Sequence, residues 1–441
     1  MRRIYPDHAY GPAPRAGCFW DTTCDLPDYP SLDRDVSADV AIIGAGFTGL
    51  NAARALVSSG ASVILLDEHA PGWGASGRNG GFCCLGGGKS SDTQLDRRFG
   101  KDARLEWRNA EKRSVAHVDN FLRETGADVD RHSEGETLLA HRPKDARAFD
   151  AEAQSIEENY GLQAVIESAD ASDRSGKAGG FYGALTVPIG FALNPRKYVA
   201  ALLQALAGTD TRLFSKAPVT GLHRHGSGWR LKSGTVEISA KNVIVATNGY
   251  SSEDIPKWLA GRYMPVQSSV AVTRPISPEE QKAQGWNSLQ MCYDTRNLLH
   301  YFRLMPNGRM LFGLRGGIKG TPGSDARAYA RLRADFDAMF AQWRRVEFSH
   351  HWTGFVCLAR KSQPFIGEIP SMPGVYCAMG YHGNGVAMGS YAGDLVGRLV
   401  AGDASVRIPM AAQSPLATFP YGRIRRVLLA PAYAMMKVAD R

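Results

Sequence analysis

Apolar and polar positions along the chain follow two different periods, and each period predicts a different kind of element. Mainly apolar segments at 39–43, 61–66 and 241–250 predict strands that are buried on both faces, as in a parallel sheet. Helices are expected after the first strand, up to about Ser59, and over 195–206, where Asn194-Pro195 provides a helix start. Strands that alternate with helices in this way predict an α/β domain of the Rossmann type.

A second set of segments alternates between apolar and polar residues, which is the pattern of half-exposed antiparallel strands. Residues 219–239 predict a meander of three strands, and 298–304 with 309–314 predict a hairpin around Asn307-Gly308. Helices are expected over 101–125, 146–160, 324–345 and 386–401. Because the short strands and helix of 134–187 interrupt the first pattern, we expect an inserted α+β domain built on an antiparallel sheet.

These patterns predict the following division of the chain. Residues 1–37 would form an extended arm that wraps the first domain, which is discontinuous and comprises 38–92, 188–262 and 352–401. The inserted domain would comprise 93–187 and 263–351, and 402–441 would be a C-terminal tail. In the tail, basic residues stand beside Leu428 and Leu429. We prefer docking of the tail on the protein's own surface to the alternative, a helix on a membrane surface.

Three glycines with G-x-G-x-x-G spacing lie between the first strand and the first helix. Gly44 permits a tight turn, Gly46 lets the backbone approach a pyrophosphate, and Gly49 lets the helix pack close to the strand. The helix N-terminus would offer free N–H groups to phosphates. The next strand ends in Asp67-Glu68, about 20 residues downstream, where an acid binds ribose hydroxyls. The pattern predicts a dinucleotide site; the alternative is merely a tight strand–helix turn.

Glycine is dense again in two later segments. Residues 73–82 read Trp-Gly-Ala-Ser-Gly-Arg-Asn-Gly-Gly-Phe, and no helix or strand tolerates so much glycine. We expect a loop whose backbone passes close to something flat or charged, rather than a flexible linker, because Trp73 and Phe82 are not linker residues. A glycine turn at 380–385 precedes a helix that is rich in small residues, which predicts close packing of that helix.

Composition and charge narrow the class of protein. A chain of 441 residues with 44% hydrophobic and 22% charged residues is globular and long enough for two domains. The net charge of +9 is scattered among acidic residues, so we expect an ordinary solvated surface, with an anionic ligand as the alternative, and no dedicated nucleic-acid surface. The seven cysteines are irregularly spaced, so we expect no metal site and a reducing compartment. Without an apolar secretory or membrane-spanning run, a cytoplasmic protein with no transmembrane segment is expected.

Five motifs in this order resemble those of a known family. They are the glycine turn at 44–49, the string Trp73 to Gly81, the strand end Val245-Ala-Thr-Asn-Gly-Tyr250, the hairpin with Tyr301-Phe-Arg303, and Gly380-Tyr-His-Gly-Asn-Gly385. The chain is similar over about 30–440 to the FAD-dependent D-amino-acid oxidase/glycine oxidase/sarcosine oxidase superfamily, and most of all to its gamma-glutamylputrescine oxidase branch. The resemblance implies an FAD-binding domain and a substrate domain.

The resemblance also implies roles for particular residues. Asp67 would hold the adenosine ribose, Val219 would meet the adenine through its backbone, and the loop at 76–82 would pass along the flavin ring. The turn at 380–386 would place N–H groups against the flavin N1/O2 edge, where reduction leaves negative charge. The complete set of residues expected to bind FAD is Gly44, Gly46, Phe47, Thr48, Gly49, Asp67, Glu68, Gly74, Ala75, Ser76, Arg78, Asn79, Gly80, Gly81, Phe82, Val219, Ala246, Thr247, Gly380, His382, Gly383, Asn384, Gly385 and Val386.

The substrate side departs from the family pattern. Members that act on simple α-amino acids hold the carboxylate with an arginine where this chain has Val356-Cys357. Monomeric sarcosine oxidases attach the flavin through a cysteine near the position of Cys357; we expect non-covalent FAD, with this covalent bond as the alternative. The candidates for the pocket wall are Tyr301, Arg303, Arg315 and His382, and Arg315 would meet an acidic group. His300 and His382 are weighed as bases against purely structural roles.

The leading hypothesis is an FAD-dependent oxidoreductase that oxidises a C–N bond of a small amine or amino-acid derivative. A hydride passes to flavin N5, the product is an imine, and hydrolysis yields a carbonyl compound. The first alternative is a flavoprotein dehydrogenase subunit that passes electrons to a partner or quinone rather than to oxygen. The second is a non-catalytic FAD-binding module, which the pocket-forming hairpin and the inserted domain disfavour.

Overall fold

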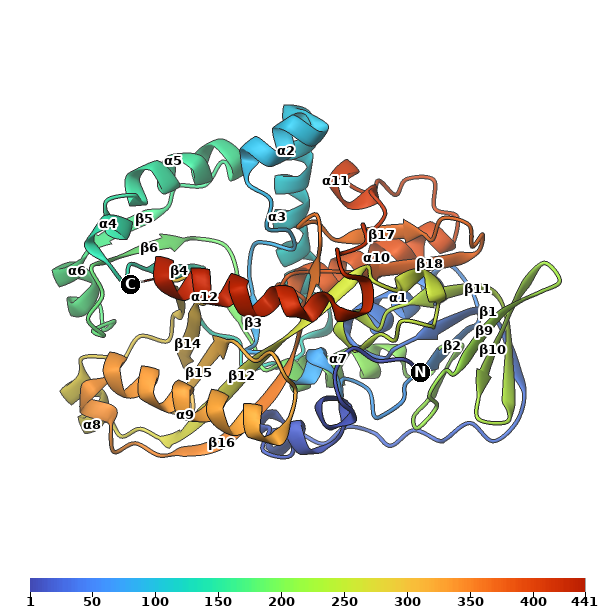
Figure 1. Ribbon diagram of the computed structural model, residues 1–441, viewed down its shortest axis with the longest axis horizontal. Helices are drawn as coiled ribbons and strands as arrows, with labels where there is room; N and C mark the ends of the chain where they lie inside the picture. Colours follow the sequence, from blue (N-terminus) through green and yellow to red (C-terminus); the bar gives the residue numbers. More distant parts are fainter. Residues whose placement is uncertain (441) are drawn as a thin grey trace.

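Two eight-stranded β-sheets organise the molecule in the computed structural model, which describes residues 1–440 (Figure 1). The first sheet has the order β17-β18-β11-β1-β2-β8, and the five strands from β18 to β8 are parallel. The β9–β10 hairpin extends from β11, and β17 pairs antiparallel with β18 at the edge. The strands of this sheet are β1 Val36–Ile43, β2 Val63–Leu66, β8 Thr211–Phe214, β9 Gly221–His225, β10 Gly228–Ser233, β11 Val236–Val245, β17 Phe365–Glu368 and β18 Val375–Met379.

The second sheet is almost entirely antiparallel and has the order β16-β12-β15-β14-β13-β4-β6-β5. One parallel pairing, between β13 and β4, joins the hairpin half of the sheet to the part that comes from 134–187. Its strands are β4 Glu136–Leu139, β5 Val165–Ser168, β6 Gly183–Val187, β12 Tyr263–Pro275, β13 Met291–Asp294, β14 His300–Leu304, β15 Arg309–Arg315 and β16 Phe348–Ala359; the separate pair is β3 Phe82–Cys83 with β7 Phe191–Ala192.

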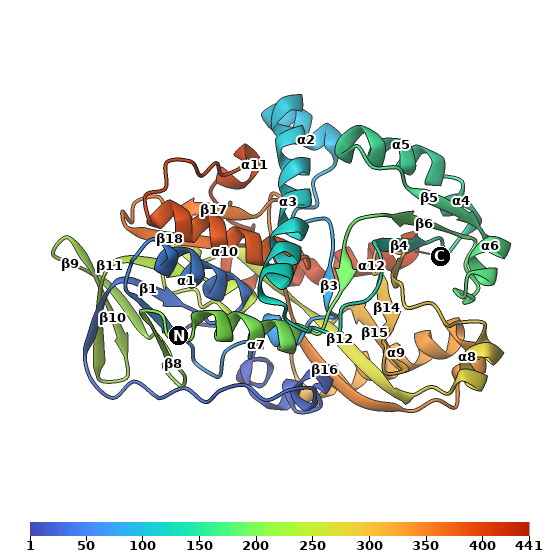
Figure 2. The same ribbon diagram turned by 180° about the vertical axis from the view of Figure 1, so that it is seen from behind.

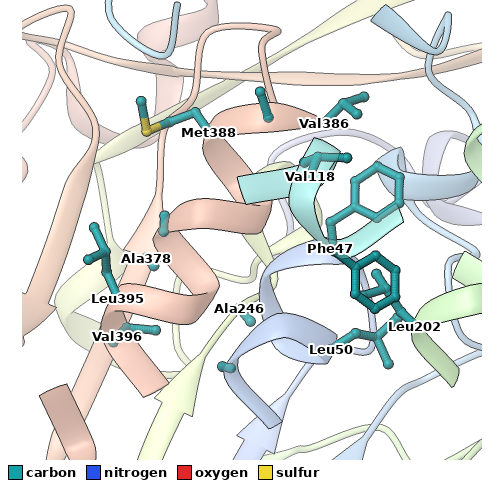
Figure 3. Packing of buried hydrophobic residues seen from close by; sticks show 14 of the residues in the cluster. Phe47, Leu50, Val118, Leu202, Ala246, Ala378, Val386, Met388, Leu395 and Val396 are labelled. Carbon is teal, nitrogen blue, oxygen red and sulfur yellow. The ribbon is translucent and has the colours of Figure 1, made fainter. Parts of the chain in front are cut away.

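Helices cover both sheets, and four of them pack on one face of the first sheet (Figure 2). These four are α1 Phe47–Ser58, α3 Lys101–Thr125, α7 Pro195–Leu206 and α10 Ala387–Val400. In Figure 3, Phe47 and Leu50 of α1 lie beside Val118 of α3 and Leu202 of α7 in one apolar core. The remaining helices are α2 Asp92–Phe99, α4 Pro143–Ala146, α5 Phe149–Tyr160, α6 Ala169–Arg174, α8 Pro278–Gln284, α9 Pro322–Met339, α11 Met410–Gln413 and α12 Leu429–Ala439.

Close packing of α10 on α1 confirms the prediction made from the small residues after the second glycine turn. A Cβ atom added to Gly393 would lie 2.2 Å from the backbone oxygen of Thr48. The hydroxyl of Thr48 donates to the carbonyl of Gly389 over 2.9 Å. The N-termini of α1 and α10 are thereby held side by side, next to the two glycine turns.

The α/β class with an antiparallel second sheet is confirmed, whereas several element boundaries were wrong. The third meander strand and the apolar run at 241–250 are one strand, β11, which pairs with β10 in its first half and with β18 in its last residues. Residues Asn248–Tyr250 form a 3₁₀ turn instead of continuing it. Helix α2 was not expected, and the helix expected over 146–160 begins three residues later as α5, after the short helix α4.

The first 22 residues of the N-terminal arm are not extended, which corrects a second expectation. It forms 3₁₀ turns at Asp7–Tyr10, Ala13–Arg15 and Phe19–Thr22. Trp20 packs with Trp352 of β16, and Tyr5 packs with Phe355 of the same strand. These first residues therefore lie against the second sheet. Residues 24–35 form no helix or strand and follow the first sheet, where Leu26 and Tyr29 pack on its core, as expected. The expected domain boundaries stay predictions.

The C-terminal segment docks on the rest of the chain, as preferred from the sequence. Buried Arg425 forms an ion pair with Glu253 over 2.6 Å. The carboxylate of Asp440, just after α12, accepts from the backbone N–H groups of Asn297 and Leu298. No helix within residues 1–440 is both long enough and apolar enough to cross a membrane.

Candidate functional site

A cavity of about 490 Å³ is bordered by both sheets and by both glycine turns. Of the residues expected to bind FAD, most line it: Gly44, Gly46, Phe47, Thr48, Asp67, Glu68, Gly74, Ala75, Ser76, Arg78, Asn79, Gly80, Phe82, Val219, Ala246, Thr247, Gly383, Asn384, Gly385 and Val386. Of the substrate-side candidates, Tyr301, Arg315 and Cys357 line it as well. The expected residues that are not among its lining residues are Gly49, Gly81, Gly380, His382 and Arg303.

The first glycine turn has the geometry that its spacing predicts. Gly44 has φ = 106°, a left-handed conformation that favours glycine. A Cβ atom on Gly46 would lie 2.7 Å from the hydroxyl of Ser76, which accepts from the N–H of Phe47 at the start of α1. Gly49 lies outside the cavity because it packs α1 on the strand: its Cβ would lie 1.9 Å from the Gly44 carbonyl oxygen.

Asp67 lies at the same end of the cavity. Its two carboxylate oxygens accept from the N–H groups of Ala45 and His69, each over 2.8 Å. A carboxylate offers about four acceptor positions, so roughly two remain for other donors. Burial raises the pKa of Asp67 to about 6, against the lowering effect of these two hydrogen bonds. Glu68 instead forms an ion pair with Arg3 of the N-terminal arm.

The loop after β2 is held in place by a buried arginine. The guanidinium of Arg78 stacks 4.0 Å from the centre of the Trp73 ring, and its Nε donates to the Trp73 carbonyl over 2.9 Å. One terminal nitrogen, Nη2, is buried and has no hydrogen-bond partner. Desolvation lowers the pKa of Arg78. The loop thus brings a positive charge to the border of the cavity.

Hydrogen bonds to several segments fix the second glycine turn. Gly380 N–H donates to the side chain of Asn248 over 3.0 Å, and His382 N–H donates to the Cys357 carbonyl over 3.1 Å. The imidazole of His382 accepts from the N–H of Ala359. The backbone carbonyl of His382 accepts from the guanidinium of Arg315 over 2.8 Å. The turn leads directly into α10, whose first N–H groups have no partners within the helix.

His382 was expected to line the pocket or act as a base, and the structure contradicts this. Its ring lies against the backbone of β16 rather than at the cavity. Desolvation, with the charges of Lys89 and Arg315, lowers its pKa to about 3, so the ring is neutral at physiological pH. His382 therefore holds the turn.

Arg303 was expected in the pocket wall because it shares a strand face with Tyr301, and this too was wrong. The β3–β7 pair covers it: its guanidinium donates to the Leu193 carbonyl over 2.7 Å and contacts His132 over 3.0 Å. A Cβ atom on Gly81 would lie 2.4 Å from its Nη2. Tyr301 and Arg315 remain at the cavity, and the Tyr301 hydroxyl pairs with Ser268 over 2.9 Å.

His300, the other candidate base, is a structural residue of the second sheet. It is buried between Asp294 at 2.7 Å and Asp335 at 3.0 Å, away from the cavity lining. Burial alone would lower its pKa, but hydrogen bonds to the two carboxylates outweigh burial and raise it.

Replacing His300 by glutamine should therefore destabilise the fold without changing the chemistry. The change removes the buried cation between the two carboxylates, although Asp294 keeps its ion pair with Arg296. We therefore expect the free energy of unfolding to fall by about 3 kcal/mol. In the wild type, the contacts of His300 with the two carboxylates stabilise the fold fully below the pKa of about 6.5 that histidine has in the unfolded chain. They stabilise it progressively less as pH rises through the raised pKa of the folded state. Chemical unfolding at several pH values measures this. Normal stability together with lost turnover would restore His300 as a base.

The sequence did not indicate several residues that also line the cavity. Lys89, Glu136, Leu138 and Tyr293 come from the loop after β3 and from the middle of the second sheet. Arg3 and Tyr10 come from the N-terminal arm. No local motif marks these positions, since only the pairing of distant strands brings them together.

Comparisons with known proteins agree with this arrangement. Residues 39–399 match the family model described as FAD dependent oxidoreductase. A probable oxidoreductase, OrdL, of Rhizobium meliloti is 28% identical over 95% of this chain and 96% of its own length. Gamma-glutamylputrescine oxidoreductase of Escherichia coli is 26% identical over 90% of this chain and 92% of its own length. Glycine oxidase from Geobacillus kaustophilus has the same fold, with a TM-score of 0.69 over 86% of this chain and 100% of that one, at 19% identity.

Proposed function

Because the chain belongs to the family of FAD dependent oxidoreductases, we propose that it oxidises a C–N bond of a small amine or amino-acid derivative to an imine, which water hydrolyses to a carbonyl product. The family membership makes it an enzyme rather than a mere binding module. The observation that carries the proposal is one cavity bordered by the first glycine turn with Asp67 and by the second glycine turn with Tyr301 and Arg315.

The residues along this cavity fit FAD. The close approach of Gly46 and the N–H groups at the start of α1 suit the diphosphate. The open acceptor positions of Asp67 suit the ribose hydroxyls, which would also offset the cost of burying this carboxylate. Arg78, which borders the cavity, adds a positive charge that suits an anionic cofactor. Next to the second glycine turn, the start of α10 would face the electron-rich edge of the flavin.

We propose that the FAD is held without a covalent bond. Cys357 borders the cavity but is only 2% exposed, and desolvation raises the pKa of its thiol to about 12. A thiol of this kind is a poor nucleophile, because the thiolate is the reactive form.

Acid precipitation of the purified protein should accordingly leave all the flavin in the supernatant. Replacing Cys357 by alanine should leave the flavin content unchanged, since the side chain acts as a small buried residue. Absorbance of the pellet and the supernatant measures both results. Yellow colour in the pellet of the wild type, together with a colourless pellet of the alanine variant, would establish a covalent bond between Cys357 and the flavin.

Bound FAD would accept the electrons of the C–N bond, and the side chains would position the substrate. Arg315 is a half-buried cation whose hydrogen bond goes to a backbone carbonyl, so it can still bind an anionic group of the substrate. Tyr301 is adjacent to Gly80 of the loop, where a Cβ atom would lie 2.8 Å from the tyrosine ring. Nearby positive charge favours the neutral form of a bound amine, which is the form that can give up its electrons.

The substrate that we propose resembles the one named in the Escherichia coli relative, gamma-glutamylputrescine, which is an elongated amine. Incubating the purified protein with a panel of amines and amino acids tests the proposal. A carbonyl product should form in a one-to-one ratio with the amine consumed, as measured by a carbonyl-trapping reagent. Consumption without a carbonyl product, or no consumption by any member, would reject it.

The alternative electron acceptor, a partner protein or quinone, is favoured by one observation. The C-terminal segment exposes Tyr421, Ile424, Val427 and Met435 near the basic residue Arg423. Such an apolar and basic surface suits a partner or a membrane surface. Turnover with oxygen alone, compared with turnover with an added artificial acceptor, decides between the two. Equal turnover rates support an oxidase, and a much higher rate with the added acceptor supports a dehydrogenase.

A further inference from the structure

One face of the second sheet extends the cavity well beyond Tyr301. Tyr301 of β14 pairs with Tyr293 of β13, which pairs with Leu138 of β4, which pairs with Leu185 of β6. All four side chains line the cavity. Neighbouring strands lie about 4.8 Å apart, so β4 runs about 10 Å from β14. The cavity thus has room for a substrate that continues past the reacting carbon.

Glu136 lies on this extended wall. It precedes Leu138 by two residues on the same strand face, it lines the cavity, and it is only 6% exposed. Its carboxyl faces the N–H of Leu85, the hydroxyl of Tyr293 and the thiol of Cys84. Within residues 1–440 it makes no ion pair of 4.0 Å or less. A buried carboxylate without a cation is costly, which indicates that a ligand supplies the counter-charge.

Lys89 borders the same part of the cavity. Its side chain is exposed and lines the cavity, and desolvation lowers its pKa, with a further contribution from the charge of Arg315. In the part of the chain that the structure describes, it has no carboxylate within 4.0 Å either. Glu136 and Lys89 thus present opposite charges to the cavity without being bonded to each other.

We propose that Glu136 and Lys89, the remote pair, bind the end of the substrate that is remote from the oxidised carbon. Glu136 binds an ammonium group there, and Lys89 binds a carboxylate on the same end. The remote pair thereby selects elongated amines that end in a zwitterionic, amino-acid-like group. This inference rests on the proposed amine oxidation and specifies its substrate class.

The test uses four primary amines of equal chain length whose remote end is a methyl group, an ammonium, a carboxylate, or both charged groups. Anaerobic mixing with the FAD-loaded protein separates the Kd of each amine from the limiting rate of flavin bleaching. For the wild type, each charged group should tighten binding by about tenfold or more, because hydrogen bonds to charged groups are the strong ones. The limiting rate should change little, since the remote pair does not touch the reacting carbon.

Two variants then assign the two contributions. Glu136→Gln should remove the advantage of the ammonium, and Lys89→Met should remove the advantage of the carboxylate. Both should leave the Kd of the methyl-ended amine within about twofold. Glu134→Gln, an exposed carboxylate two residues before Glu136, is the matched control and should change nothing.

The ammonium's advantage should also depend on pH. Burial raises the pKa of Glu136 to about 7, with Lys89, Tyr293 and Cys84 as the titratable groups that face it. Because the ionised carboxylate binds the ammonium, the advantage should be full above this pKa and should fall as pH decreases below about 7. Glu136→Gln should show no such dependence.

Three results would overturn the inference. Wild-type protein that binds all four amines equally has no remote subsite. A Glu136→Gln variant that slows bleaching by the methyl-ended amine would place Glu136 at the reacting nitrogen instead. An ammonium advantage that persists in Glu136→Gln would assign it to another group. If no amine bleaches the wild-type flavin, the proposed oxidation fails, while Kd values from flavin difference spectra still test the remote pair.

Discussion

Replacing Gly46 by valine should yield a protein that folds but purifies without flavin. The new side chain would point at the Ser76 hydroxyl, which lies 2.7 Å from the position of its Cβ, and would fill the space that a pyrophosphate needs. It would also disturb the hydrogen bond from the N–H of Phe47 to Ser76 at the start of α1. The ratio of flavin absorbance to protein absorbance after purification measures the effect, and we expect it to fall to near zero.

Gly323→Ala is the control for this experiment. Gly323 lies in the first turn of α9, and the nearest atom to an added Cβ is 3.6 Å away, at the flexible end of Arg327. The control should retain full flavin. Circular dichroism separates loss of binding from loss of fold. A folded Gly46→Val protein with normal flavin content would show that the dinucleotide does not lie at this turn.

Replacing Arg315 by methionine should give the largest loss of activity among the substrate-side residues. The change removes a half-buried positive charge from the cavity and one hydrogen bond that holds the second glycine turn. A hydrogen bond to a charged group is worth about 1.5–3 kcal/mol, which corresponds to a fall of about ten- to a hundredfold in kcat/KM. Steady-state kinetics with an amine that carries an acidic group measures it.

Two comparisons show which function of Arg315 is lost. Arg315→Lys keeps the charge but loses the planar guanidinium geometry, so we expect partial recovery. Exposed Arg345→Met should be neutral. If the role is to bind the substrate, KM should rise most for acidic amines. A uniform loss of kcat for all amines with unchanged KM would instead assign Arg315 to the turn alone.

Local glycine chemistry explains why much of the fold and one end of the site could be predicted from the sequence. Gly44, Gly46 and Gly49 each serve a need within a few residues, so their spacing is sufficient to predict the turn. The helix-period pattern at 101–125 corresponds to α3, Lys101–Thr125, because no later contact overrides it. The strand β11 was divided wrongly, because polar Lys241 and Asn242 resemble a break although the strand only changes neighbours there.

The substrate side depends on contacts between distant segments, and these were less predictable. Tyr301 and Arg303 do share a strand face, but the pairing of β3 with β7 covers Arg303 and leaves Tyr301 at the cavity. Glu136 and Lys89 belong to a strand and a loop that meet only through the order of strands in the second sheet. Strand order is a property of the whole fold, so no short motif predicts such residues.

Anaerobic titration of the purified protein with the amine panel tests the central claim most directly. The account predicts a flavin absorbance spectrum whose bands bleach when an amine substrate is added and return when an electron acceptor is admitted. A protein without flavin bands, or one whose flavin no amine bleaches, would contradict it.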